Sequence, residues 1–355
     1  MPLWALLIPI AAAVLLAAAL LVPVGVALAI ACLAALMGTV IASVHHAEVV
    51  AHRVGEPFGT LVLSLAITII EVALIVSMML ANPVGSAALA RDTVFATVMI
   101  ICNGVVGLCL LVGGLKHREQ AFHVEGANAA LATLIALTAL TLVLPGFTTS
   151  SPGPTYTRPQ LIFAAVMSLV LWSAFLFVQT VRHRDYFLPV DHPDDARVHA
   201  APPSNRLAVA SFLMLIVALV AVVGLAKVLS PRIEAAMDSA GAPKSALGIA
   251  IALLVLLPET WAAARAAQAN RLQTSLNLAF GSALASIGLT IPVVAATAVV
   301  RGVALPLGLD SKELVLLVLS FALASITLVS GRTHVMQGVV HLVIFAAFVF
   351  FALVP

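Results

Sequence analysis

The chain has 355 residues, of which 63% are hydrophobic and only 9% are charged, and its formal net charge is +2. Ordinary globular domains carry about 25% charged residues, so this composition excludes a soluble globular protein. Lys and Arg residues form no basic cluster interleaved with aromatic residues, which excludes a nucleic-acid-binding surface. The composition therefore predicts a protein that lies in a lipid bilayer.

We predict an all-α polytopic membrane protein with about eleven transmembrane helices. A bilayer core of about 30 Å needs about 20 apolar residues per helix, and charges, Pro and Gly divide the chain into apolar runs of that length. The first run lacks the basic flank of a signal peptide, so we expect a retained helix. The predicted spans are 3–21, 24–45, 57–81, 92–115, 127–146, 160–181, 206–229, 244–266, 274–300, 312–329 and 335–353.

The chain divides into two halves around the polar segment RHRDYFLPVDHPDDARVHAAPPSN at 182–205. We predict a leading helix in 1–22, a five-helix repeat in 24–181, a linker in 182–205 and a second five-helix repeat in 206–355. Duplication of an odd number of helices places the second copy upside down in the membrane, as in many transporters. Loops on the N-terminal side hold more Lys and Arg than the opposite loops, which favours a cytoplasmic N-terminus and linker.

Two glutamates lie deep inside apolar runs, Glu71 in SLAITIIEVALIVSMML and Glu259 in LGIAIALLVLLPETWAA. Each lies on the second helix of its half. A carboxylate in the middle of a span costs about 2.5–3.5 kcal/mol on insertion scales, and such residues usually mark an ion or proton path. The alternative is that each glutamate has a packing role. We predict that the two form one site that binds cations and protons.

Two ionised carboxylates in a dry site repel each other and are poorly solvated, so the empty site has a high free energy. Protons or a bound cation relieve that state. Ca²⁺ takes about 6–8 oxygen ligands, which include carboxylates and carbonyls. Competition between protons and a cation for the same oxygens is itself a mechanism of antiport.

Polar residues near the two glutamates are candidates for supporting roles. Thr68 lies one helical turn before the first glutamate, although a threonine often bonds to its own helix. Pro258 precedes the second glutamate and predicts a kink, which either frees carbonyl groups for a cation or is only a bend in the helix. Asn103, and the pair Ser282 and Ser286, lie on the helices that follow the glutamates. They could complete a cation shell, or they could serve helix packing.

The segment HHAEVVAHRVGE places His45, Glu48 and His52 at i, i+3 and i+7, which is one side of a helix. Three interpretations remain open. Glu48 could take part in a proton relay beside the first glutamate, the three residues could bind a metal ion in an intramembrane metalloenzyme, or they could form a hydrated helix end. We predict that the protein is not an enzyme and that it binds no cofactor.

The stretches GEPFGTLVLSLAITIIEVALIVSMML (55–80) and LLPETWAAARAAQANRLQTSLNLAFGSALASIGLTIP (256–292) resemble the ChaA-type bacterial cation/proton antiporters. These belong to the calcium/cation antiporter (CaCA) superfamily, close to the CAX exchangers. The resemblance implies a leading helix and two inverted five-helix repeats. It implies export of Ca²⁺, and in the ChaA group also of Na⁺ and K⁺, in exchange for H⁺. It assigns the repeat glutamates to Glu71 and Glu259, and the acidic residue of the preceding helix to Glu48.

The sequence departs from the family pattern just before each glutamate. Many CAX proteins have asparagine there, whereas this chain has ITII and VLLP. The absence of these asparagine ligands favours transport of monovalent ions.

From the buried glutamates and the resemblance together, we predict a secondary antiporter of the bacterial inner membrane that exchanges cytoplasmic Ca²⁺, Na⁺ or K⁺ for H⁺ by alternating access. The transported ions are substrates, and the oligomeric state stays open. A mainly monovalent Na⁺(K⁺)/H⁺ antiporter and a passive cation channel are the alternatives.

Overall fold

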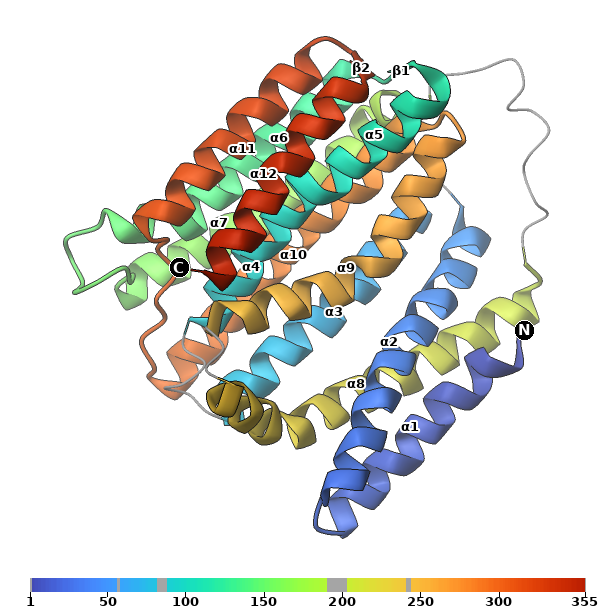
Figure 1. The fold of residues 1–355 in the computed structure, drawn as a ribbon, viewed down its shortest axis with the longest axis vertical. Coiled ribbons are helices and arrows are strands. Elements are labelled where there is room, and N and C mark those ends of the chain that lie inside the picture. Colours follow the sequence, from blue (N-terminus) through green and yellow to red (C-terminus); the bar gives the residue numbers. More distant parts are fainter. Residues whose placement is uncertain (1, 56–57, 82–87, 190–202, 241–243, 355) are drawn as a thin grey trace. The chain divides into compact units, whose positions relative to one another are not determined.

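The computed structural model describes residues 2–55, 58–81, 88–189, 203–240 and 244–354, and these residues are mainly helical (Figure 1). The chain folds into two compact units. One comprises Met1–Ser86 and His199–Ala242, and the other comprises Ala87–Val198 and Pro243–Pro355. Contacts define these units, whereas the predicted domains are internal repeats, so the repeat boundaries at 24–181 and 206–355 stay a prediction.

The predicted helices are confirmed. Within the described residues, nine helices are long and apolar enough to cross a membrane, and the two parts of a bent helix, Gly248–Leu257 and Glu259–Gln268, make up to ten. A shorter apolar helix covers Ser64–Leu80. Together they account for the eleven predicted spans.

The first unit contains α1 (Leu3–Leu21), α2 (Val26–Val54), α3 (Phe58–Ala81) and α8 (Asn205–Ala240). Helix α1 packs against α2 and α8. Its buried face is built from Ala5, Pro9, Ala12 and Ala19. Small side chains on this face let the helix backbones approach closely, which is the usual basis of helix packing in membranes.

A hydrogen bond fixes α1 to α2 at the proline of α1. Pro9 has no backbone N–H, so the carbonyl of Ala5 lacks its normal partner four residues later. The buried His46 of α2 supplies the missing donor, because its Nε2 lies 2.8 Å from the Ala5 oxygen. The sequence thus creates an orphaned carbonyl in one helix and satisfies it from the next.

We expect His46→Leu to lower the free energy of unfolding by about 1–3 kcal/mol, because it leaves a buried carbonyl without a partner. Pro9→Ala restores an N–H for that carbonyl. The stabilisation from Pro9→Ala should therefore be larger in the His46→Leu background than in the wild type. Thermal unfolding of the four proteins in detergent measures this difference. Equal effects of Pro9→Ala in the two backgrounds would contradict the role of His46.

The second unit contains the remaining elements. Its helices in the first half of the chain are α4 (Leu89–Met99), the π-helix η1 (Ile100–Val105), α5 (Val106–His117), α6 (Val124–Thr138), η2 (Ala139–Val143), η3 (Leu144–Gly146), α7 (Arg158–Phe177), η4 (Val178–Arg182) and η5 (Arg184–Phe187). Those in the second half are α9 (Lys244–Gln268), α10 (Leu272–Arg301), α11 (Ser311–Val329) and α12 (Val335–Leu353).

Glycines bring α5 and α12 together, and Figure 1 shows the two helices running side by side. A Cβ atom on Gly338 would lie 2.5 Å from the backbone nitrogen of Leu111 and 2.9 Å from the carbonyl oxygen of Gly107. A Cβ atom on Gly114 would lie 2.8 Å from the backbone nitrogen of Val335. Only glycine permits this approach, which places the side chains of α12 directly over α5.

Two short strands, β1 (Glu119–Ala121) and β2 (Arg332–His334), pair antiparallel at one end of this unit, with Gln120 opposite Thr333. Side chains of β1 and of the last turn of α5 also cap the C-terminal end of α9. Gln120 Nε2 donates to the Ala267 carbonyl at 2.8 Å, and Lys116 Nζ donates to the Gln268 carbonyl at 2.9 Å. Helix C-termini leave carbonyls without internal partners, so these donors fix the end of α9.

Two helices extend beyond the predicted limits. Helix α2 continues through the histidine-rich segment to Val54, and α8 continues past Pro231 to Ala240. An apolar run reports only the length inside the hydrocarbon core, and a helix can continue into the polar interface. In the predicted linker, Arg184–Phe187 forms a 3₁₀ turn, and the Asn277 Nδ2 donates to the Phe187 carbonyl at 2.6 Å. Residues 190–202 of the linker lie outside the described residues.

Candidate functional site

Glu259 is 4% exposed and begins the second part of α9, just after a bend of 49°. The bend lies at Pro258, as the sequence predicts, because proline cannot continue the hydrogen-bond ladder of a helix. Ser282 of α10 donates a hydrogen bond to Glu259 Oε2. One turn of α9 further on, Ser275 Oγ of α10 donates to the Ala263 carbonyl at 2.7 Å. Helix α10 thus holds both the carboxylate and the helix that carries it.

Ser286 lies one turn after Ser282 on α10 and is also buried. The structure therefore brings Ser282 against Glu259 and places Ser286 on the same face of the next turn. This face of α10 supplies the Ser282 hydroxyl beside a carboxylate and a second hydroxyl one turn further on, and hydroxyl oxygens are ligands of the kind that hard cations take. A ligand role for either serine stays a prediction.

Glu71 is 2% exposed and lies in α3, within the other unit. Thr68 is buried one turn earlier and donates its hydroxyl to the Ser64 carbonyl of the same helix at 2.9 Å. The threonine therefore bonds to its own helix, which is the alternative that the sequence left open. Both glutamates are buried within apolar helices, and their pairing in one site stays a prediction.

Glu48 lies on α2 and is exposed. His52 is exposed as well, while the ring of His45 lies 5.1 Å from the ring of Trp4 in α1. Within the part of the chain that the structure describes, no group of three His, Cys, Asp or Glu residues could hold a metal ion. This finding does not support a metalloenzyme built on His45, Glu48 and His52. A proton-relay role for Glu48 stays a prediction.

Asn103 lies in the π-helix η1 and is fully buried. Its Nδ2 donates to Ser320 Oγ of α11 at 2.8 Å, and its Oδ1 lies 3.3 Å from His341 Nδ1 of α12. These bonds direct the carboxamide toward α11 and α12. The predicted role of Asn103 as a cation ligand is not tested by these contacts, which engage both ends of its amide.

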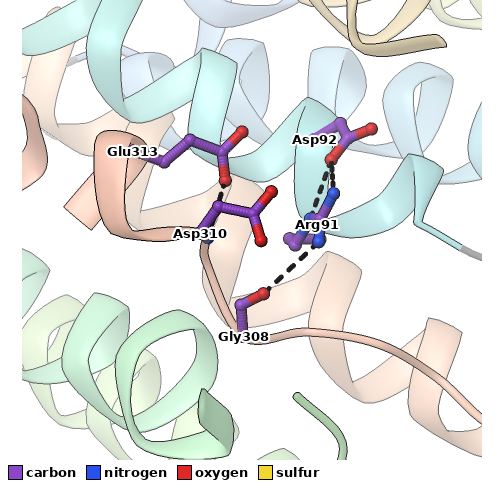
Figure 2. Close-up of polar contacts among 5 residues, drawn as sticks. All are labelled: Arg91, Asp92, Gly308, Asp310 and Glu313. Carbon is purple, nitrogen blue, oxygen red and sulfur yellow. Dashed lines mark hydrogen bonds and ion pairs between the residues drawn. The ribbon is translucent and has the colours of Figure 1, made fainter. Parts of the chain in front are cut away.

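A charged cluster that was not among the predicted site residues joins α4 to the connection before α11 (Figure 2). Arg91 Nε donates to Asp92 Oδ1 at 2.8 Å, and Arg91 Nη1 donates to the Gly308 carbonyl at 3.4 Å. Glu313 accepts from the Asp310 backbone nitrogen at 3.2 Å within the capping box of α11. The readable signal was the capping box sequence DSKE at 310–313.

The charged cluster borders a pocket lined by Asp92 and Glu313 together with apolar side chains, which include Phe95, Ile249, Leu316 and Phe348. The Asp92 side chain is only 7% exposed, and Arg91 compensates its charge directly. Removing one partner of a buried ion pair strongly destabilises the fold, because the other charge is left buried without compensation. The ion pair joins neighbouring residues of α4, and the bond from Arg91 to the Gly308 carbonyl links the start of α4 to the connection before α11.

A bundle of membrane-crossing helices that buries carboxylates within its spans is the architecture of an ion transporter. The model of the sodium/calcium exchanger protein family matches residues 3–181 and 210–354. The chain belongs to this family, and it is a multi-pass membrane antiporter of the CaCA superfamily.

Similar proteins support this assignment. The chain is 48% identical over 357 residues to the y4hA protein of Sinorhizobium fredii, which covers 100% of this chain and 97% of that protein. It is 36% identical over 328 residues to the sodium-potassium/proton antiporter ChaA of Escherichia coli, which covers 92% of this chain and 88% of that protein. The predicted resemblance to ChaA-type antiporters is confirmed.

Two solved structures share the fold. The structure of native YfkE matches with a TM-score of 0.72 at 19% identity, and covers 99% of this chain and 100% of that chain. The crystal structure of the H⁺/Ca²⁺ exchanger CAX matches with a TM-score of 0.67 at 13% identity, and covers 91% and 82%. The predicted all-α membrane fold is therefore confirmed.

Proposed function

We propose that this chain is a secondary antiporter that exchanges cytoplasmic Ca²⁺, Na⁺ or K⁺ for H⁺ by alternating access, with Glu71 and Glu259 as the exchange site. The observation that carries the proposal is the burial of these two carboxylates in apolar helices, one from each half of the chain. Charged groups are expensive in such surroundings, and they occur there chiefly on ion and proton paths.

The exchange follows from competition for the same oxygens. A carboxylate can hold a proton covalently, or it can contribute its charge and an oxygen ligand to a cation. When a proton or a cation is bound, the carboxylate charge is compensated. The site can then switch between access from one side of the membrane and access from the other. The empty site keeps uncompensated charge in a poorly solvated interior, so its crossing is disfavoured. Strict alternation between protons and cation is the result.

Ser282 has a specific part in this scheme. Its hydroxyl donates to Glu259, so it orients the carboxylate and stabilises its negative charge. Hydrogen bonds to charged groups are stronger than those between neutral groups. The hydroxyl therefore favours the form of Glu259 that binds a cation.

We expect Ser282→Ala to raise the KM for the transported cation about tenfold or more, because a hydrogen bond to a charged group contributes about 1.5–3 kcal/mol. Ser282→Thr keeps the hydroxyl and should stay within about threefold of the wild type. Cation-dependent proton flux, measured over a range of cation concentrations, gives both values. A Ser282→Ala protein with the wild-type KM would show that the hydroxyl does not act on the site.

We infer the identity of the transported ion from the relatives and from the residues around the glutamates. The Escherichia coli relative is named a sodium-potassium/proton antiporter, and a Bacillus subtilis relative at 23% identity over 250 residues is named a Ca²⁺/H⁺ antiporter. The ITII and VLLP stretches lack the asparagine side-chain oxygens that would favour a divalent ion. We therefore include both monovalent ions and Ca²⁺ among the substrates.

We propose a location in the bacterial inner membrane, with the N-terminus and the linker in the cytoplasm, on the bias of Lys and Arg in the loops. The bilayer is then the only partner that the mechanism needs besides inorganic cations and protons. No cofactor enters the scheme.

Everted membrane vesicles test the exchange. Respiration acidifies the vesicle lumen, and a pulse of Ca²⁺, Na⁺ or K⁺ should then raise the lumen pH, reported by a pH-sensitive dye. Vesicles without the protein are the control. A passive channel would admit the cation with no outward proton movement, so the lumen pH would not rise. The absence of alkalinisation with all three ions would overturn the proposal.

A further inference from the structure

A buried chain of hydrogen bonds crosses the second unit beside η1. It joins Thr327 of α11, His341 of α12, Asn103 of η1 and Ser320 of α11, and all four side chains are buried. The distances are 3.1 Å from Thr327 Oγ1 to His341 Nε2, 3.3 Å from His341 Nδ1 to Asn103 Oδ1, and 2.8 Å from Asn103 Nδ2 to Ser320 Oγ.

The chain of bonds runs in one direction. Asn103 Oδ1 can only accept, so His341 Nδ1 carries the proton that it donates. Nε2 of the neutral ring is then an acceptor, and the Thr327 hydroxyl donates to it. At the other end, Ser320 accepts from Asn103 Nδ2 and donates its own proton to the Leu316 carbonyl at 2.7 Å. Each group thus fixes the orientation of the next.

Backbone features hold the network in place. The π-helix η1 is a local widening of the helix between α4 and α5, and such π-turns are frequently found at functional sites. Gly107 lets α12 approach, because a Cβ atom there would lie 2.9 Å from the Cβ of His341. His341 therefore reaches Asn103 because Gly107 has no side chain and leaves room for the Cβ of His341.

The position of η1 gives the network its functional meaning. The π-helix contacts α9 and α10, which carry Glu259 and Ser282, as well as α11 and α12. The π-helix that carries Asn103 thus lies where four helices meet, and the Asn103 carboxamide is turned toward α11 and α12. Its Oδ1 is an oxygen of the kind that coordinates Na⁺ or Ca²⁺, and His341 occupies that oxygen.

We propose that His341 and Ser320 are positioning residues that hold the Asn103 carboxamide away from the cation, and so keep the cation affinity of the exchange site low. The inference rests on the proposed function. When His341 no longer donates, the Asn103 oxygen is left buried without its partner, which is costly. A cation at the exchange site then offers the oxygen a new partner and binds more tightly.

Kinetics of single variants test the proposal. We expect His341→Leu and Ser320→Ala each to lower the KM for Na⁺ or Ca²⁺ by about threefold to tenfold, which corresponds to one hydrogen bond. The maximal rate should not rise. His341→Asn can place an amide donor near the position of Nδ1, so it should restore the wild-type KM. The four proteins are compared in everted vesicles at matched protein amounts.

A second background separates positioning from a general structural effect. In Asn103→Ala, His341→Leu should change the KM no further, because the group through which His341 acts is gone. If His341→Leu fails to fold, Ser320→Ala makes the same comparison with a smaller change.

Three outcomes would count against the inference. An unchanged KM in folded His341→Leu and Ser320→Ala overturns it, and so does a KM effect of His341→Leu that persists in Asn103→Ala. Wild-type vesicles without any exchange would overturn the proposed function and this inference together. If the wild type exchanges and the variants keep the wild-type KM, the inference alone is overturned.

Discussion

Replacing Glu259 or Glu71 with Gln is expected to reduce proton-coupled cation exchange to the background of empty vesicles. Glutamine has nearly the same shape, so the buried packing of the 4% and 2% exposed side chains is kept. It cannot bind or release a proton in the working range, and it brings no charge to a cation. Dye-reported proton flux and radiotracer cation flux in everted vesicles measure the loss.

Glu125→Gln is the matched control, because Glu125 is an exposed glutamate in the first turn of α6. This variant should exchange like the wild type. Size-exclusion profiles of the detergent-extracted proteins show whether each variant is folded. Exchange retained by a folded Glu71→Gln or Glu259→Gln protein contradicts a site that needs both carboxylates.

Gly338→Ala is expected to have the largest effect on stability. The added Cβ would lie 2.5 Å from the backbone nitrogen of Leu111 and 2.9 Å from the carbonyl oxygen of Gly107. Backbone atoms inside a helix cannot move aside separately, so α12 must shift away from α5. Overpacking of this kind costs about 1–3 kcal/mol, and occasionally more. Thermal unfolding in detergent should show a clearly lowered Tm.

Gly281→Ala is the control for a glycine inside a transmembrane helix. A Cβ atom on Gly281 would meet no heavy atom within 4 Å. Alanine favours helix over glycine by about 1 kcal/mol, so this variant should be as stable as the wild type or more stable. A Gly338→Ala protein that melts with the wild type would show that the helices α5 and α12 do not depend on this contact.

The helices were largely predictable from the sequence, because the bilayer demands a minimum length of apolar residues. The predicted spans 3–21 and 335–353 coincide with α1 and α12. Errors lie at ends such as Val54 and Ala240, where polar residues continue a helix beyond the apolar run. Hydropathy reports burial in lipid, and it says little about where a helix ends in water.

The surroundings of the candidate site were only partly predictable. Ser282 and Glu259 were readable as polar residues in apolar runs, and they meet. The direction of Asn103 was not readable, because the π-turn at Ile100–Val105 changes the helical register and the sequence IICNGV does not signal it. His341 lies outside the predicted site, although a histidine inside the apolar run VVHLVIF is a visible signal of a buried polar group.

The pairing of α5 with α12, and of β1 with β2, has a consequence for biogenesis. Both partners of each pair come from opposite ends of the second unit's sequence, so α5 leaves the ribosome long before α12. In the interval its glycine-lined surface and the β1 backbone have no counterpart. Insertion of α5 into the membrane therefore precedes its packing against α12, and the tertiary assembly of this unit is complete only after its last helix has been made.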